Sequence, residues 1–187
     1  SWSRRRSFSN QCDSPHTVGK TFGVSPLTIQ VGDKVPSVTL AIMGSDGPVT
    51  ISTDELFSGH KVVLFALPGA YTPTCSASHL PGFVVHSDEI LATGVDRIAC
   101  LSVNDAFVMD AWGKAHNADD QVMMLADGSA EFTRAVGLEL DLSSRQMGLR
   151  SQRYAMVVED GVVTALEVEG PGEFKVSSAE AMLNLLK

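Results

Sequence analysis

The sequence predicts an α/β fold, in which a central mixed β-sheet carries helices on both faces. Three short apolar runs predict strands, and they occupy residues 62–67, 97–103 and 154–158. Continuous apolar runs of this kind are typical of strands buried on both faces, as in sheets covered by helices. The stretches with helical character occupy residues 73–92, 105–116 and 129–136. Strands and helices therefore alternate along the chain, which is the pattern of an α/β domain.

The C-terminal part predicts an antiparallel hairpin and a closing helix. An Asp-Gly pair within residues 159–161 separates two valine-rich runs, and this pair favours a tight hairpin turn. Residues 177–180 have the pattern of a capping box that opens a helix. We expect Met182, Leu185 and Leu186 of that helix to pack on the sheet. These elements together are compatible with a thioredoxin-like fold.

Composition argues against several classes of function. The 187 residues include 14 Lys and Arg against 22 Asp and Glu, a net charge of −8, whereas nucleic-acid binding needs a basic face. No apolar run approaches the roughly 18 residues that span a bilayer, so a membrane is not an expected partner. Cys12, Cys75 and Cys100 form no Cys-x-x-Cys or Cys/His cluster, so we expect neither a disulfide framework nor a metal site.

The chain is predicted to contain one folded domain, residues 28–187, preceded by a leader or tail, residues 1–27. The first twenty residues carry four basic side chains against one acid, Asp13, together with several serines. This composition is typical of an organelle transit peptide, and a disordered tail is an equally good interpretation. Either way, we exclude the segment from the fold.

The segment 68–76, Pro-Gly-Ala-Tyr-Thr-Pro-Thr-Cys-Ser, directly follows the first apolar run. Thr72 is a good helix N-cap, and Pro73 suits the first helical position because its missing N–H is not needed there. Cys75 would then lie in the first helical turn, where free backbone N–H groups and the helix dipole stabilise a thiolate. We therefore predict that Cys75 is a reactive thiol and not an inert core residue.

Pro81 and Gly82 fall inside the helix predicted over residues 73–92. An interior proline removes a helical hydrogen bond and kinks the helix, at a cost of about 3 kcal/mol. We expect a bend at this point. A sharper hypothesis is that the interruption makes the turn carrying Cys75 easier to unwind after oxidation.

At these residues the sequence resembles the peroxiredoxins, and within them the atypical peroxiredoxin 5 or type II group in its plant-like form. The signature Pro-x-x-x-Thr-x-x-Cys stands here as Pro68, Thr72 and Cys75. Longer matching stretches occupy residues 68–76, 79–83, 99–107 and 153–156. The resemblance covers roughly residue 28 to the C-terminus and implies a thioredoxin fold.

The resemblance implies a thiol-dependent peroxidase that reduces hydrogen peroxide and alkyl hydroperoxides in antioxidant defence. By that match, Cys75 attacks the peroxide and becomes a sulfenic acid, while Thr72 contacts the peroxide through its hydroxyl. Pro68 would shield the sulfur from water, and Arg153 would activate both thiolate and substrate. The resemblance also implies a homodimer, no cofactor or metal, and a plastid location, with mitochondrion or cytosol as alternatives.

The roles of four further residues stay open. A cysteine at the place of Cys100 is proposed as resolving in plant-like members, although a small buried cysteine is also common in such a strand. Without resolution by Cys100, a thiol donor such as glutathione, a glutaredoxin or a thioredoxin would reduce Cys75 directly. His79 shares a helix side with Cys75, which favours packing or tuning over a role as base. Arg145 is interpreted as a surface charge, and for Arg150 surface and site roles are equally supported.

Two rival functions are considered. A thiol–disulfide oxidoreductase on the same fold is disfavoured because Cys75-Ser76-Ala77-Ser78 lacks the second thiol of a Cys-x-x-Cys pair. A redox sensor or relay would instead signal through oxidised Cys75, with oxidation-dependent complexes and slow turnover of peroxide.

Overall fold

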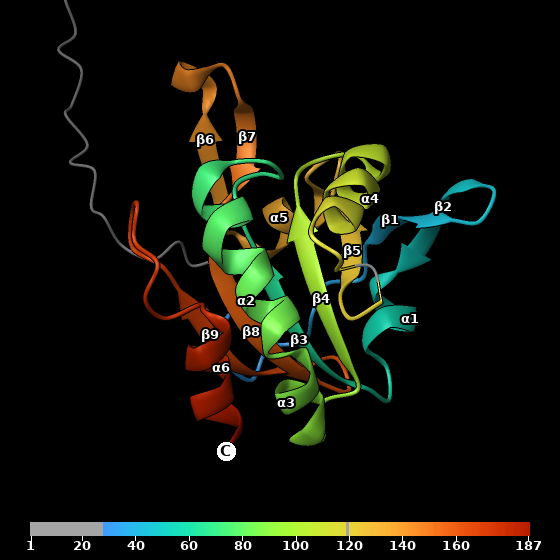
Figure 1. Cartoon of the computed structure of the whole chain (residues 1–187), viewed down its shortest axis with the longest axis vertical. Helices are drawn as coiled ribbons and strands as arrows, with labels where there is room; N and C mark the ends of the chain where they lie inside the picture. Colours follow the sequence, from blue (N-terminus) through green and yellow to red (C-terminus); the bar gives the residue numbers. More distant parts are fainter. Residues whose placement is uncertain (1–27, 119) are drawn as a thin grey trace, which may run out of the picture.

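The computed structural model describes residues 28–118 and 120–187 (Figure 1). The predicted leader, including Cys12, lies outside the described residues. A seven-stranded sheet runs through the molecule in the order β2-β1-β5-β4-β3-β8-β9, and a two-stranded ribbon, β6-β7, stands apart from it. β3 pairs in parallel with β4, and β4 with β5, while the other pairs are antiparallel. The predicted mixed sheet is therefore confirmed.

The bounds of the elements are as follows. The large sheet comprises β1 (Thr39–Gly44), β2 (Gly47–Ser52), β3 (Lys61–Ala66), β4 (Arg97–Ser102), β5 (Met123–Ala126), β8 (Tyr154–Glu159) and β9 (Val162–Val168). The ribbon comprises β6 (Glu139–Leu142) and β7 (Gly148–Ser151), joined through a 3-10 turn, Ser143–Arg145. The helices are α1 (Thr53–Phe57), a π-helical turn (Cys75–His79), α2 (Leu80–Val85), α3 (Ser87–Ala92), α4 (Ala106–Ala115), α5 (Glu131–Val136) and α6 (Ala179–Leu186).

Two hydrophobic clusters lie on opposite faces of the sheet, because successive side chains of a strand point to opposite sides. Val63 and Phe65 of β3 pack into the first cluster with residues of α2, α3, α4 and α6. Val62 and Leu64 pack into the second with residues of α1 and α5. The prediction of helices on both faces is confirmed. No helix of the described residues is long and apolar enough to cross a bilayer.

The helix expected over residues 73–92 is present but divided. It begins at Pro73, winds as a π-helical turn, and passes through Pro81 into α2 before breaking at His86. In the π-helical turn the N–H of Leu80 donates to the carbonyl of Cys75, five residues back. The expected irregularity at Pro81 is thus a widened turn directly before it, and such single π turns are frequent at functional sites.

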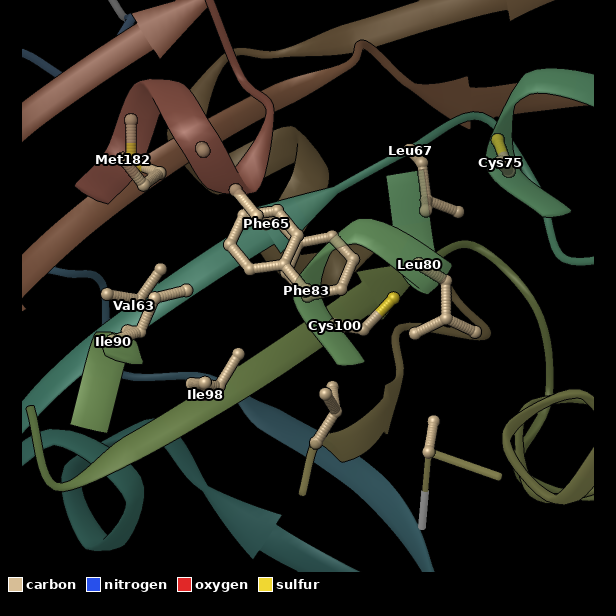
Figure 2. Close-up of a cluster of buried hydrophobic side chains, with 14 of the residues drawn as sticks. Val63, Phe65, Leu67, Cys75, Leu80, Phe83, Ile90, Ile98, Cys100 and Met182 are labelled. Atoms are coloured by element: carbon tan, nitrogen blue, oxygen red, sulfur yellow. The ribbon is translucent and has the colours of Figure 1, made fainter. Parts of the chain in front are cut away.

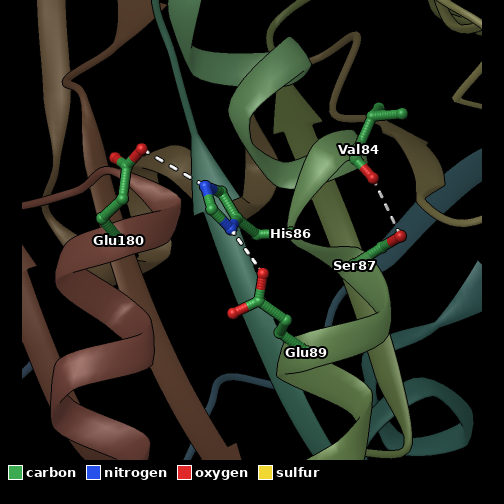
Figure 3. A network of polar contacts seen from close by, with 5 residues as sticks. All are labelled: Val84, His86, Ser87, Glu89 and Glu180. Atoms are coloured by element: carbon green, nitrogen blue, oxygen red, sulfur yellow. Dashed lines mark hydrogen bonds and ion pairs between the residues drawn. The ribbon is translucent and has the colours of Figure 1, made fainter.

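A polar network ties the break between α2 and α3 to the C-terminal helix (Figure 3). The ring of His86 contacts Glu89 of α3 through Nδ1 (3.1 Å) and Glu180 of α6 through Nε2 (3.3 Å). Ser87 donates its hydroxyl to the carbonyl of Val84 (2.9 Å). These contacts hold α2, α3 and α6 together over the face of the sheet that carries Cys75.

The C-terminal predictions are partly corrected. The hairpin is confirmed, with positive φ at Asp160 (48°) and Gly161 (79°), as a tight turn of this type requires. Ser178 is the N-cap of α6, since its hydroxyl accepts from Ala181, so the predicted capping box is wrong. Leu185 is 50% exposed, and Leu183 is buried instead. Ala179 is also buried, and the helical period places residue 183, four positions later, on the same side as Ala179, whereas residue 185 turns towards solvent.

Candidate active site

Cys75 lies in the first turn of the helix that follows β3, at the carboxyl end of that strand. Its side chain is 0% exposed. The carbonyl of Thr72 accepts from the N–H of Ser76 (2.9 Å), which makes Thr72 the residue before the helix, as predicted. However, the Thr72 hydroxyl donates to the carbonyl of Gly69 (2.8 Å), so it closes the preceding loop and does not cap the helix.

Arg153 reaches Cys75 from the connection between β7 and β8. Its Nη2 donates to Cys75 Sγ at 3.0 Å, and its Nη1 lies 2.8 Å from Nδ1 of His79. The guanidinium carbon also stands 5.8 Å from the centre of the Phe174 ring, close enough for a cation–π contact. The fold therefore brings the predicted cysteine and arginine, 78 positions apart, into direct contact.

His79 is fully buried among aromatic rings, with ring centres 4.9 Å from Phe65, 5.7 Å from Phe83 and 5.0 Å from Phe174. Its Nε2 lies 2.9 Å from the carbonyl of Ser177. A carbonyl only accepts and a guanidinium only donates, so the contacts assign the proton to Nε2 and leave Nδ1 as the acceptor for Arg153. Burial, reinforced by the charge of Arg153, lowers the pKa of His79 to about 3. The imidazole is therefore neutral.

Acid is expected to destabilise the protein through His79. The pKa of His79 falls from 6.5 in the unfolded chain to about 3 when folded, so its stabilising contribution is complete above pH 6.5 and is lost towards pH 3. At about 1.4 kcal/mol per pH unit, lowering the pH from 6.5 to 5 should remove roughly 2 kcal/mol of unfolding free energy. Urea titrations at both pH values would measure this loss. His79→Phe, which cannot titrate there, should lose correspondingly less, and equal losses would contradict the assignment.

Glu169 fixes the segment that contacts His79. The residue is 8% exposed, and its carboxylate accepts from the backbone N–H groups of Lys175 (2.7 Å), Val176 (3.0 Å) and Ser177 (3.3 Å). The hydroxyl of Ser177 donates to it as well (3.0 Å). Burial alone would raise the pKa of the Glu169 carboxyl, but these hydrogen bonds lower it. The sequence did not identify Glu169 as a site residue. In the structure, Glu169 holds Ser177, whose carbonyl orients His79.

Arg150 and Asn104 hold the loop between β3 and the helix. Arg150 Nη1 donates to the carbonyl of Pro68 (3.2 Å), and Asn104 Oδ1 accepts from the N–H of Ala70 (3.0 Å). A Cβ at Gly69 would stand only 2.7 Å from Arg150 Nη1, so a larger residue would displace the guanidinium. Arg150 therefore holds the loop that leads to Cys75. Of the surface role and the site role that the sequence left open, the structure supports a role at the site.

A pocket of about 660 Å³ opens beside the buried sulfur. Three of the predicted site residues, Pro68, Thr72 and Arg153, line it together. The rest of the lining comes from Pro73 and Thr74, from the β6-β7 ribbon and the adjoining Gln152, and from residues 169–173. Among the described residues, no group of three His, Cys, Asp or Glu side chains is placed to bind a metal ion.

Cys100 lies in β4, beneath the helix that carries Cys75. It is 0% exposed, and Figure 2 shows it close to Leu80 and Phe83 of the same buried cluster. Both Cys75 and Cys100 are free thiols. Burial, followed by the charge of the neighbouring Cys75, raises the pKa of Cys100. In the folded state Cys100 is thus a protonated core thiol, and its role as resolving cysteine stays a prediction.

The fold and site together define a class of protein. A cysteine stands at the start of a helix on a thioredoxin-like sheet, an arginine contacts its sulfur, and a pocket opens beside it. No second cysteine follows at the spacing of a disulfide oxidoreductase. This combination is that of a thiol-dependent peroxidase.

The chain belongs to the Redoxin family, whose model matches residues 30–183. It is 49% identical over 180 residues to Peroxiredoxin-2E, chloroplastic, of Arabidopsis thaliana, covering 93% of this chain and 77% of that protein. It is 54% identical over 164 residues to Peroxiredoxin-2E-2, chloroplastic, of Oryza sativa, covering 85% and 73%. The structure of reduced Prx3 in complex with hydrogen peroxide from Vibrio vulnificus is similar, with a TM-score of 0.83, 54% identity and coverage of 86% and 100%.

These relatives confirm the predicted family, fold and activity. The chain is a peroxiredoxin of the type II group, an enzyme that reduces peroxides through a thiol and acts in antioxidant defence. The thioredoxin-like fold is confirmed as well.

Proposed function

We propose that Cys75 is the residue that reacts with peroxide. Its thiolate attacks one peroxide oxygen, so that a sulfur–oxygen bond forms while the oxygen–oxygen bond breaks. The leaving oxygen takes up a proton and departs as water or an alcohol, and Cys75 becomes a sulfenic acid. The observation that carries this proposal is the contact of 3.0 Å between Arg153 Nη2 and the buried Cys75 Sγ, beside an open pocket that Arg153 also lines.

The remaining site residues are proposed to orient the peroxide and stabilise the departing oxygen. An ordinary thiol is already a few per cent thiolate at pH 7, so ionisation alone gains only about thirtyfold, near 2 kcal/mol. The rest must come from positioned donors and a cation. Arg153 supplies the charge and the donors, and Pro68 covers the pocket wall beside it. Thr72 lines the same pocket, and because its hydroxyl donates its proton to Gly69, its oxygen is left to accept from the peroxide.

His79 is proposed as a positioning residue that acts through Arg153. Its neutral ring accepts from Nη1, which leaves Nη2 directed at the sulfur. Ser177 fixes the ring from the other side, and Glu169 fixes Ser177. A role as general base is not favoured, because Nδ1 is occupied by a donor and faces away from solvent.

Cys100 is proposed to resolve the sulfenic acid after the helix carrying Cys75 opens. A disulfide requires two Cα atoms within about 7 Å, and Cys100 is covered by α2 in the reduced fold. An external dithiol such as thioredoxin, or glutathione with a glutaredoxin, would then restore both thiols. If the helix stays closed, the external thiol reduces the sulfenic acid directly, with water as the other product.

Counting thiols after one equivalent of hydrogen peroxide tests these proposals. In a Cys12→Ser background, we expect the two remaining thiols to be lost. Peptide mass mapping should then find a disulfide bond between Cys75 and Cys100. Adding Cys100→Ser should leave a sulfenic acid on Cys75 that a dimedone reagent traps. A trapped sulfenic acid in the presence of Cys100 would contradict only the resolving role. No oxidation of Cys75 within minutes would contradict the peroxidase mechanism itself.

We further propose a plastid location and a homodimer. Two relatives are named as chloroplastic, and the basic, serine-rich composition of the first twenty residues is consistent with import. Exposed aromatic rings near the site, Tyr71 (57%) and Phe107 (65%), favour a contact between two copies. Import of a fluorescent fusion into isolated chloroplasts and sedimentation of the reduced protein test the two proposals separately, with mitochondrial import or a cytosolic location as the alternatives to the first.

A further inference from the structure

The pocket beside Cys75 extends along the β6-β7 ribbon. Leu140 and Leu142 stand two residues apart on β6, so they point to the same side, and both line the pocket. Arg150 pairs with Leu140 across the ribbon and also donates to the carbonyl of Pro68. Leu140 therefore lies beside the loop that leads to Cys75, and Leu142 lies about 7 Å farther from that loop along β6.

Arg145 stands at the outer end of the same wall. It closes the 3-10 turn beyond Leu142, lines the pocket and is exposed. Within residues 28–118 and 120–187, its side chain forms no ion pair or hydrogen bond. The two acids of the pocket are engaged elsewhere: Glu169 accepts from backbone N–H groups, and Glu173 pairs with Lys175 (3.7 Å).

The pocket thus has a reactive sulfur beside its inner end, apolar side chains along one wall and an unpartnered cation at its outer end. A volume of about 660 Å³ is far more than hydrogen peroxide fills. An apolar chain would bury its carbons against Leu140, Leu142 and Met147, because removing such surface from water is favourable. A planar guanidinium at the rim matches the geometry of a carboxylate.

We propose that the enzyme selects hydroperoxides with a carboxylate at the end of an apolar chain, such as oxidised unsaturated fatty acids, and that Arg145 binds the carboxylate. This inference rests on the proposed role of Cys75. The chemistry at the sulfur is unchanged: the oxygen–oxygen bond breaks, Cys75 gains one oxygen, and a hydroxy acid leaves after taking up a proton. Selectivity arises away from the sulfur, at the carboxylate.

Comparing linoleic acid hydroperoxide with its methyl ester tests the inference, because the two differ only in the charge that Arg145 would bind. At low ionic strength and below the micelle concentration, we expect kcat/KM to be roughly threefold to fivefold higher for the acid, the size typical of an exposed ion pair. Arg145→Gln should bring the ratio of acid to ester close to one, and Arg145→Lys should retain part of it. Arg134→Gln removes an exposed positive charge on α5, outside the pocket, and should keep the wild-type ratio.

The outcomes separate this inference from the proposed function. Equal kcat/KM for acid and ester in the wild type, or a ratio unchanged in Arg145→Gln, overturns the role of Arg145. If the same preparation reduces hydrogen peroxide, only that role is lost. If it reduces neither hydrogen peroxide nor the ester, the proposed role of Cys75 fails first. A preference that also disappears in Arg134→Gln would show a general effect of net charge and likewise overturn the inference.

Discussion

Replacing Arg153 with Gln is expected to slow the oxidation of Cys75 by hydrogen peroxide by about 10² to 10³-fold, the usual cost of removing one donor aimed at developing charge. Among the described residues, Arg153 is the side chain that donates to Cys75 Sγ, and that sulfur is shielded from water. Glutamine keeps a planar donor but loses the charge and the second N–H arm. Competition against a peroxidase of known rate, at pH 7, would measure the effect.

Two further variants serve as controls for the loss of rate in Arg153→Gln. Cys75→Ser defines the rate without the reacting sulfur. Arg153→Lys keeps the positive charge but cannot contact Sγ and His79 at once, since a guanidinium fork differs from an ammonium point charge. We expect its rate to lie between those of the wild type and Arg153→Gln. A decrease of less than tenfold in Arg153→Gln would contradict the role of the arginine.

His79→Phe is expected to lower the same rate by roughly tenfold to a hundredfold, because an unsatisfied buried donor costs about 1 to 3 kcal/mol. Phenylalanine preserves the ring packing against Phe65, Phe83 and Phe174, but it leaves Arg153 Nη1 without its acceptor. The guanidinium is then free to turn from the sulfur. Stopped-flow oxidation by hydrogen peroxide would measure the change.

The effect of His79 should pass through Arg153, and a double-mutant cycle can show this. In an Arg153→Gln background, His79→Phe should change the rate little. His79→Gln, whose amide oxygen can accept from Nη1, should recover part of the lost activity in the otherwise unchanged enzyme. Additive losses in the double variant would mean that His79 acts independently, and its proposed positioning role would then be wrong.

The central strands and their helices could be predicted because strands buried on both faces, here β3, β4 and β8, appear in the sequence as continuous apolar runs. The β1-β2 hairpin has no such run, since most of its side chains are half-buried or exposed. β5 is only four residues long, β6 alternates between exposed and half-buried positions, and β7 is mostly half-buried. Short or partly exposed strands therefore escape a search for apolar runs.

The site residues likewise divide into those that the sequence could predict and those that it could not. Cys75, Thr72 and Pro68 belong to one local segment, and the resemblance supplied Arg153. The partner of His79, by contrast, is the backbone carbonyl of Ser177, which no side-chain pattern can reveal. The one available signal for Glu169 was an acid directly before the turn-forming Gly-Pro-Gly of residues 170–172. Likewise, only the ribbon pairing distinguishes Arg150, which holds the loop, from Arg145 at the turn.

The buried partner of Arg153 is the uncharged ring of His79, and its neutrality determines the net charge around the sulfur. A carboxylate in place of His79 would cancel the field of the guanidinium before it reached the sulfur. The nearby Glu169 instead directs its charge to backbone N–H groups. In the proposed mechanism the reacting thiolate and the guanidinium therefore sum to zero net charge. In the same proposed mechanism, oxidation to a neutral sulfenic acid reverses that balance and leaves the half-buried guanidinium without this counter-charge. The proposed chemical step would thus weaken an electrostatic attraction that holds the helix of Cys75 against Arg153, at the stage when a reductant must gain access.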